Sequence, residues 1–308
     1  MSINQQAIEL LENNRYEDAL KLFQKAVDKS RDVQSLTNLA WMYCYEEEED
    51  TKAMSLLEET IIMKPSSHMP YNLLGEIYIR KEKWSSAKGV LSNSISIHPT
   101  KTAYNNLAIA NYHIGNLKEA SKYFLMASEK SDNAMYSHVK CLIELGDSNE
   151  AIIKLGEFSE NNDKFVGDVE VADLYVELGR YQEAIKWFEK GWKTYWKQPN
   201  WVSRYVYSLL QLNDSTRARE ILNEAINQKL DEIKEAIEEE CDDDWLESDK
   251  QAHINELLNE KVEYEQMING ISSGHIPTME FDTFIMTGCY LFGCARHNHP
   301  EYDDKQKE

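Results

Sequence analysis

The stretch "YNLLGEIYIRKEKWSSAKGVLSNSISIHP", residues 71–99, contains one complete structural unit of the chain. The small residue Gly75 lies twelve positions before Ala87, and the large residue Leu91 follows Ala87 by four. Residues four apart share one face of a helix, and small side chains let two helix backbones approach closely. Pro99 closes the unit, because proline can follow a helix but cannot continue it. The stretch therefore predicts two helices packed as an antiparallel hairpin.

The same pattern recurs along most of the chain. Its alanines are spaced 34, 34, 33, 31, 33 and 34 residues apart, and a large apolar residue follows each by four positions. The alanines are Ala19, Ala53, Ala87, Ala120, Ala151, Ala184 and Ala218. The large residues are Phe23, Leu57, Leu91, Phe124, Leu155, Phe188 and Leu222. A fixed period of this length predicts an array of stacked hairpins in which each unit buries its face against its neighbours.

Each unit resembles a tetratricopeptide repeat. The residues that carry the resemblance are Tyr71, Leu74, Gly75, Tyr78, Trp84, Ala87, Leu91 and Pro99. The resemblance covers about residues 2–228 in seven copies, and the fifth copy departs from the pattern at Met135, His138 and Val139. It implies an all-α fold, a right-handed α-α superhelix, whose concave face binds peptides or protein segments.

Residues 1–228 are predicted to form this array, and residues 229–308 an acidic, amphipathic helical cap with a polar tail. Residues 231–249 hold eleven carboxylates against one lysine. They are interpreted as a solvated helix and acidic loop, or alternatively as a site that attracts a basic partner with Trp245 as an anchor. Residues 278–295 are expected to form a last apolar helix packed on the final repeats.

Charge and cysteine content limit the function classes. The net charge of −21 disfavours nucleic-acid and membrane binding and favours basic or amphipathic protein partners. The five cysteines are odd in number and scattered, which indicates a reducing, cytoplasmic location rather than a disulfide framework. The apolar stretch at residues 284–295 is shorter than the roughly 20 residues that a membrane span needs.

One group of side chains near the C-terminus has metal-ligand chemistry. Cys289, Cys294, His297 and His299 are candidate ligands, but their C-x4-C-x2-H-x-H spacing is not that of common structural zinc sites. The alternative, that the cysteines are buried thiols and the tail binds the array, is preferred. The letters HNH at 297–299 do not indicate a nuclease. Nucleases of that kind need a ββα fold around the histidines and a surface that tolerates DNA, and this acidic chain is expected to offer neither. No enzyme motif is present, so neither catalysis nor a cofactor is expected.

The resemblance implies which first-helix residues face a partner. They are Trp41, Tyr45, Asn72, Glu76, Arg80, Asn105, Ile109, Tyr112, His113, Lys140, Glu144, Asp173, Glu177 and Tyr207. Asn72 and Asn105 offer an amide donor and acceptor that suit a peptide backbone. Asn38 and Asn106, in contrast, are interpreted as asparagines that the repeat itself carries. Arg80, Lys140 and Arg204 lie in separate repeats, which argues against a clamp for a terminal carboxylate.

The sequence therefore predicts a non-catalytic module that binds a basic or amphipathic protein segment, in the manner of an immunity or inhibitor protein. One alternative is a cytoplasmic receptor for signalling peptides. Such receptors usually add an N-terminal domain, whereas this chain begins with its first repeat. The other alternative is a metalloprotein that uses the C-terminal cysteines and histidines.

Overall fold

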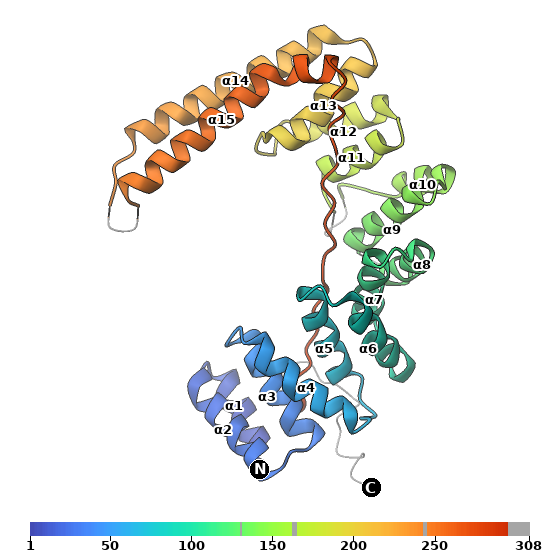
Figure 1. The fold of residues 1–308 in the computed structure, drawn as a ribbon, viewed down its shortest axis with the longest axis vertical. Coiled ribbons are helices and arrows are strands. Elements are labelled where there is room, and N and C mark those ends of the chain that lie inside the picture. Colours follow the sequence, from blue (N-terminus) through green and yellow to red (C-terminus); the bar gives the residue numbers. More distant parts are fainter. Residues whose placement is uncertain (130, 162–164, 243–244, 295–308) are drawn as a thin grey trace. The chain divides into compact units, whose positions relative to one another are not determined.

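The computed structural model describes residues 1–129, 131–161, 165–242 and 245–294, and within them it contains fifteen α-helices and no strand (Figure 1). The first fourteen helices follow one another as seven pairs. They are α1 (Ile3–Glu12), α2 (Tyr16–Lys29), α3 (Val33–Tyr45), α4 (Asp50–Ile62), α5 (Met69–Arg80), α6 (Trp84–Ile97), α7 (Lys101–His113), α8 (Leu117–Ala127), α9 (Asp132–Glu144), α10 (Ser148–Leu155), α11 (Asp168–Glu177), α12 (Tyr181–Gly191), α13 (Pro199–Gln211) and α14 (Ser215–Glu238). The last helix is α15 (Glu247–Ser272). The predicted all-α class is confirmed.

The chain divides into two compact units. The N-terminal unit combines residues 1–145 with the C-terminal segment, defined as residues 283–294, and the second unit consists of residues 146–282. The division falls between α9 and α10, inside the fifth repeat, whose sequence departs from the pattern. The predicted boundary at residue 228, between array and cap, stays a prediction.

The core of both units follows the alanine register. The seven alanines that recur once per repeat, which we call the register alanines, are all fully buried. The large residues four positions after them are at most 5% exposed. Gly75 shows why a small residue is needed opposite them: a Cβ atom at this position would lie 2.5 Å from Cδ2 of Leu91. That distance is below van der Waals contact, so a glycine sets how closely α5 and α6 approach.

Turns within the hairpins use the left-handed backbone region. Gly115 has a φ of 80° and Asn14 a φ of 59°, which stop the first helix of a pair and return the chain antiparallel. Pro65 and Pro99 lie shortly after the ends of α4 and α6, as expected. Pro199 is the first residue of α13, where its missing N–H costs no hydrogen bond.

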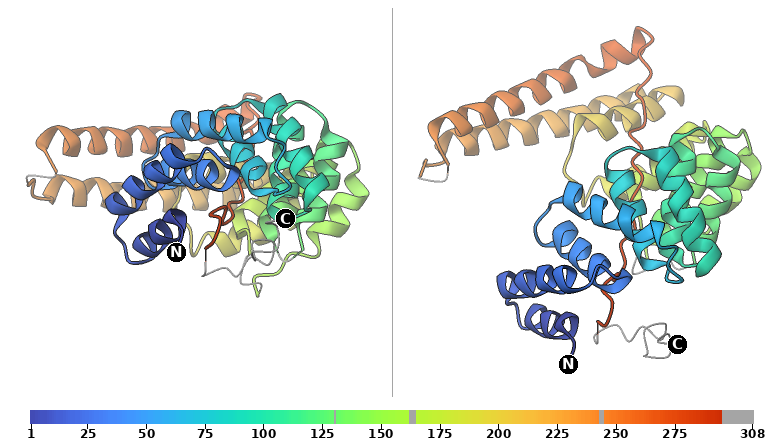
Figure 2. Two further views of the ribbon diagram at one scale, coloured as in Figure 1. Left: turned by 90° about the horizontal axis from the view of Figure 1, so that it is seen from below. Right: turned by 60° about the horizontal axis from the view of Figure 1, so that its bottom comes forward.

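The second unit ends in a long helical hairpin. Helix α14 has 24 residues and α15 has 26, and the two lie side by side and antiparallel in both views of Figure 2. Nζ of Lys229 lies 2.6 Å from a carboxylate oxygen of both Glu232 and Glu260, which joins the helices. The hydroxyl of Tyr264 donates to the carbonyl of Lys197 at 2.8 Å and fastens the hairpin at the α13 end.

The expectation of a helix at 278–295 is wrong for the described part of that range. Residues 275–294 contain no helix, and Figure 1 shows this stretch as an extended chain. Gly288 and Gly293 disfavour a helix, and Gly293 has a φ of 88°. The packing prediction is also wrong for residues 283–294, which belong to the N-terminal unit and not to the final repeats.

No helix in the described part of the chain is both long and apolar enough to cross a membrane.

Two glycine substitutions test the packing argument. Gly75→Ala should lower the free energy of unfolding by about 1–3 kcal/mol, because the new methyl group overlaps the buried Leu91. Gly89→Ala is the matched control, since a Cβ there meets nothing within 4 Å. It should raise the free energy of unfolding by about 0.5–1 kcal/mol through helix propensity. Urea unfolding followed by circular dichroism measures both, and a stabilising Gly75→Ala would refute the close approach.

Candidate functional site

The C-terminal segment lies on the first helices of the second, third and fourth repeats. Its backbone and side chains hydrogen-bond to residues of α3, α5 and α7, which precede it in the sequence by 170–254 positions. Four asparagines on these helices, Asn38, Asn72, Asn105 and Asn106, define what we call the asparagine surface. Three of these asparagines hold the extended backbone of the segment by side-chain hydrogen bonds.

Two of these asparagines each bind one residue of the segment by two hydrogen bonds. Nδ2 of Asn38 donates to the carbonyl of Phe292 at 3.0 Å, and the N–H of Phe292 donates back to Oδ1 at 2.7 Å. Asn106 makes the same pair with Met286, at 2.8 and 3.0 Å. These bonds involve only the backbone of the segment, so they select an extended chain and not a particular side chain.

A third asparagine extends the contact by one bond. Nδ2 of Asn105 donates to the carbonyl of Phe284 at 2.8 Å. Phe284, Met286 and Phe292 are separated by even numbers of residues. Alternate residues of an extended chain present N–H and C=O to the same edge, so all three offer their polar groups on one side.

The position of Asn72 explains why it does not bind the segment backbone. Asn38, Asn72 and Asn106 are spaced by 34 residues, one per repeat, whereas the segment advances six residues over the two repeats from Asn106 to Asn38. Each repeat therefore corresponds to three residues of the segment, which is an odd number. The segment residue nearest Asn72 consequently presents its N–H and C=O groups to the edge of the segment that faces away from the asparagines. Oδ1 of Asn72 accepts from Ser94 at 2.5 Å, and its buried Nδ2 has no hydrogen-bond partner among the described residues.

In the third repeat, where Asn72 makes no backbone contact, a buried carboxyl group binds the segment instead. Glu76 lies one turn after Asn72 on α5 and is fully buried. It accepts hydrogen bonds from the hydroxyl of Tyr290 and, at 2.6 Å, from that of Tyr45. Burial raises the pKa of Glu76 to about 7, although both phenol hydrogen bonds favour the charged form. Burial likewise raises the pKa of Tyr290 well above its ordinary value, so the phenol is the proton donor.

Apolar side chains of the segment complete the contact. Tyr290 joins the core cluster that includes Ile77 and Leu107, and Leu291 joins the cluster that includes Ile8 and Leu36. Tyr290 and Leu291 are each 3% exposed. Burying each of these side chains contributes about 1.5–3 kcal/mol, so the segment is held by apolar contact as well as by its backbone.

The second unit holds the residues just before the segment with an arginine. The buried Arg204 on α13 donates to the carbonyl of Pro277 at 3.1 Å and to Oδ1 of Asp173 at 2.7 Å. It also donates to Oε1 of Glu177 at 3.0 Å. Burial raises the pKa of Asp173 to about 6, and the guanidinium opposes that shift. Nδ2 of Asn200 donates to Glu280 at 3.0 Å in the same unit.

The predicted concave-face residues fall into three groups. Those in direct contact with the segment are Glu76, Asn105 and His113, whose Nε2 lies 3.3 Å from Oγ1 of Thr283. Those that pair with a residue of the same helix or of another helix are Tyr45, Arg80, Tyr112, Lys140, Glu144, Asp173, Glu177 and Tyr207. Those that pack in or against the core are Trp41, Asn72 and Ile109. Their role in binding a partner stays a prediction.

Sequence reasoning did not select Asn38 and Asn106, the two asparagines that make paired backbone bonds. The signal that identifies them is their period: Asn4, Asn38, Asn72 and Asn106 recur at intervals of 34 residues, in step with the register alanines. Asn4 is also buried, and its Nδ2 donates to Ser35 at 3.0 Å.

The proposed metal ligands are only partly within the described residues. Cys289 and Cys294 are half-buried against the core of the first repeats, and burial raises the pKa of the Cys289 thiol to about 11. His297 and His299, together with the rest of the polar tail, lie outside the described residues. The described residues contain no group of three or more potential metal ligands.

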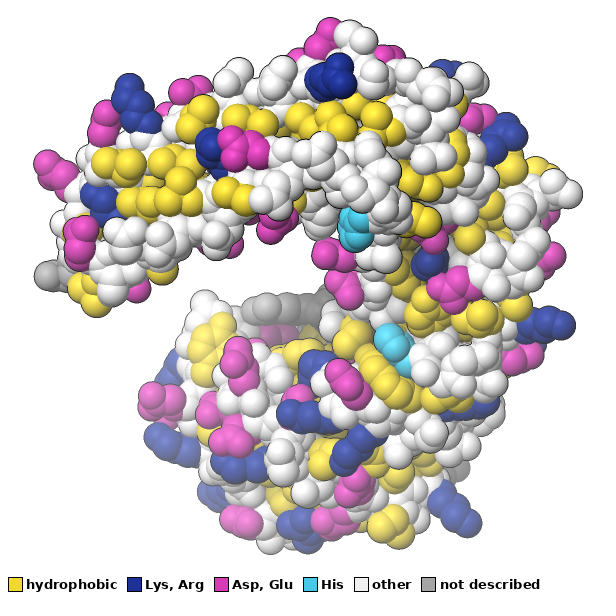
Figure 3. All heavy atoms as spheres, turned by 45° about the horizontal axis from the view of Figure 1, so that its top comes forward, with side chains coloured by type: hydrophobic (Ala, Val, Ile, Leu, Met, Phe, Trp, Pro, Cys, Tyr) yellow, Lys and Arg dark blue, Asp and Glu magenta, His cyan; other side chains and the backbone are white. Residues whose placement is uncertain are grey.

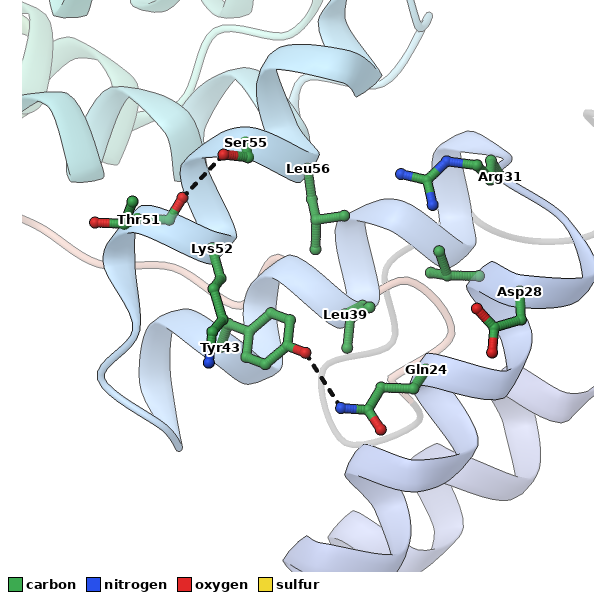
Figure 4. Close-up of a pocket in the computed structure, with 10 residues that line it drawn as sticks. Gln24, Asp28, Arg31, Leu39, Tyr43, Thr51, Lys52, Ser55 and Leu56 are labelled. Carbon is green, nitrogen blue, oxygen red and sulfur yellow. Dashed lines mark hydrogen bonds between the residues drawn. The ribbon is translucent and has the colours of Figure 1, made fainter.

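A separate pocket lies between α2, α3 and α4 and is shown in Figure 4. Nε2 of Gln24 donates to the hydroxyl of Tyr43 at 3.2 Å, and the hydroxyl of Ser55 donates to the carbonyl of Thr51 at 3.2 Å. Arg31 at its edge forms an ion pair with Glu59 at 2.6 Å. Gln24, Tyr43, Ser55 and Arg31 thus already bond to groups of the protein itself, whereas the asparagine surface binds a separate segment, which makes it the stronger candidate site.

The titration of Glu76 gives a test of this geometry. Its pKa in the folded chain is about 7, above the ordinary value of 4.5, so the folded state retains a proton that the unfolded state releases. The stability that this group contributes is therefore complete below pH 4.5 and is lost as the pH rises through 7. Glu76→Gln should remove this part of the pH dependence. Urea unfolding of both chains between pH 4 and 8 measures it, and equal pH profiles would contradict the burial of a titrating carboxyl group.

Comparison with known proteins finds two family models that match parts of the chain and several similar solved structures. Residues 6–155 match the family of ChAPs, the Chs5p-Arf1p-binding proteins, and residues 169–191 match a tetratricopeptide repeat. Similar solved structures include the MamA protein, with 15% identity over 62% of this chain and 92% of its own and a TM-score of 0.44. MamA from Desulfovibrio magneticus RS-1 has 14% identity over 50% and 90%, with a TM-score of 0.46. YrrB, described as a TPR protein with an unusual peptide-binding site, has 17% identity over 67% and 91%, with a TM-score of 0.42.

None of the curated proteins compared with the chain matches it significantly. The helix pairs recur at the alanine period in both units, and the tetratricopeptide match spans α11 and α12, one complete pair. The chain therefore contains a tetratricopeptide repeat at residues 169–191, within an all-α fold of successive helices.

Proposed function

We propose that this protein is a non-catalytic module that binds an extended segment of a partner protein on the asparagine surface. The observation that carries the proposal is the pair of two-bond contacts from Asn38 and Asn106 to the backbone of Phe292 and Met286. A side-chain amide that uses both its donor and its acceptor on one residue recognises any chain that lies extended in this register. The C-terminal segment then occupies the surface as an internal ligand.

The proposed partner is basic or amphipathic, and binding is proposed to regulate or neutralise that partner. The net charge of −21 supports a basic partner, because an acidic surface steers positively charged chains toward it. Residues 6–155 match a family named for binding two proteins, Chs5p and Arf1p, which supports protein binding for this region. The range of that match includes all four residues of the asparagine surface.

An external ligand must compete with the internal one. A tethered segment has a high effective concentration at its own site, in the millimolar range for short flexible links. The apolar contacts of Tyr290 and Leu291 add to its hold. A partner segment therefore binds well only if it offers comparable contacts or if the internal segment is weakened.

Hydrogen exchange tests whether the asparagines hold the segment. In the unmodified chain the amides of Met286 and Phe292 should be protected, because both donate to side-chain oxygens. Asn38→Ala combined with Asn106→Ala should speed their exchange about fivefold or more, since each hydrogen bond contributes about 0.5–1.5 kcal/mol. Asn72→Ala is the control and should leave exchange at residues 286 and 292 unchanged. Equal acceleration by Asn72→Ala would contradict the alternating register.

Peptide binding tests the function itself. Met286→Pro in the full chain removes the N–H that donates to Asn106 and so weakens the internal ligand. A labelled peptide of residues 281–294, with Cys289→Ser and Cys294→Ser, should then bind at least about tenfold more tightly than to the unmodified chain. Fluorescence anisotropy measures this binding.

The matched control for the peptide experiment is Met286→Pro together with Asn38→Ala and Asn106→Ala, which should lose the gain. Circular dichroism establishes that both variants remain folded. If the peptide binds neither the Met286→Pro chain nor its control, the segment is a fixed part of the fold and the surface is not a ligand site.

A further inference from the structure

The α14–α15 hairpin exposes a row of large apolar side chains. Leu230 and Ile237 on α14 are 45% and 56% exposed, and Leu258 and Val262 on α15 are 43% and 45% exposed. Figure 3 shows hydrophobic side chains in rows along this hairpin. Scattered apolar residues are normal on a protein surface, but a continuous row along two adjacent helices indicates an interaction site.

The row on α14 follows helical spacing. Ile226, Leu230, Ile233 and Ile237 are separated by four, three and four residues, which places them on one side of the helix. On α15, Ile254, Leu258 and Val262 are separated by four residues each and likewise share one side.

Both rows flank the same side of the hairpin. Ile233 and Leu257 pack together where the helices meet, in a small core cluster that also contains Ala236. Leu230 lies three residues before Ile233 and Leu258 one residue after Leu257, which turns them from these contact positions by about 60° and about 100° in the same sense. Because α14 and α15 are antiparallel, rotations of the same sense bring the two rows toward one face. We call this face the hairpin seam; its members are Ile226, Leu230, Ile237, Ile254, Leu258 and Val262.

Two adjacent antiparallel helices with exposed apolar rows on one face can accept a third helix. The seam positions 226–237 span about 16 Å of α14 at 1.5 Å per residue, which corresponds to roughly three turns of a bound helix. A helix with apolar residues three and four apart would place them between the two rows and complete a three-helix bundle.

The charge of the hairpin decides what kind of helix fits. Residues 215–272 carry seventeen aspartates and glutamates against six lysines and arginines. At the end of α14 and start of α15, Glu238, Glu239, Glu240, Asp242 and Glu247 are all exposed. Two copies of this hairpin placed seam to seam would bring together two surfaces that each carry an excess of eleven negative charges (17 − 6), which opposes self-association. A basic helix would instead be attracted.

We propose that the hairpin seam binds a basic amphipathic helix of a partner protein. This site lies within the second unit and is separate from the asparagine surface, so the proposal does not depend on the function proposed for that surface. Apolar residues of the partner fill the seam, and its lysines and arginines lie toward the carboxylates at the hairpin end.

A model helix tests the proposal on the full chain. The probe is a labelled 21-residue peptide with the repeating sequence LKKLLKL, and its control is a peptide of the same composition without helical periodicity. Leu230→Ser combined with Leu258→Ser should weaken binding of the probe about tenfold or more, because central apolar contacts dominate helix-in-groove affinity. Ile62→Ser combined with Ile153→Ser is the matched control; both residues are more exposed than the seam leucines and lie outside the hairpin. It should leave the dissociation constant unchanged.

Three further measurements separate the possible outcomes. An acidic peptide with the sequence LEELLEL should bind at least about tenfold more weakly than the basic probe. Asn38→Ala with Asn106→Ala should not alter probe binding, which keeps this test independent of the asparagine surface. Equal binding of the periodic and non-periodic peptides, or an unaffected Leu230→Ser/Leu258→Ser chain, would overturn the proposal. So would sedimentation showing a dimer that this double variant dissociates, because the occupant would then be a second copy.

Discussion

The structure depends on the close approach of two helices at a small residue in every repeat. Seven register alanines are fully buried, and a large side chain one turn later fills the space beside each. Because a hairpin alone leaves one face uncovered, each pair must pack on the next, and the array is stable only as a series. This regular stacking also brings equivalent positions of successive first helices into line. The asparagines that hold the C-terminal segment are such positions.

The fold was largely predictable from the sequence because its determinants are local and repeated. The spacing of Ala87 and Leu91 recurs through the array, and left-handed turns occur at Gly115 and Asn14 as their residue types indicate. The C-terminal segment was not predictable by the same reasoning. Its apolar content resembles that of a helix, and its conformation is set by partners that precede it by up to 254 residues. Period and composition contain no information about such contacts.

The candidate site was predictable in kind but not in detail. An asparagine-rich first-helix surface was expected, and Asn105 does contact the segment. The paired contacts, however, come from Asn38 and Asn106, which sequence reasoning assigned to the repeat framework. Which asparagines bind depends on the ratio between the repeat spacing and the rise of an extended chain. That ratio is a property of the packed helices, and so Asn72, which has the same sequence position within its repeat, is left without a backbone contact.

This ratio has a consequence for the length of any chain held in the same way. Since each repeat advances an extended chain by an odd number of residues, two-bond contacts can form only at every second repeat. The nearest pair of such contacts is separated by the distance from Met286 to Phe292. A shorter fragment reaches one of them at most. The affinity would therefore increase stepwise, rather than gradually, with the length of the ligand. The surface would select ligands first by the number of residues that they span and only then by their sequence.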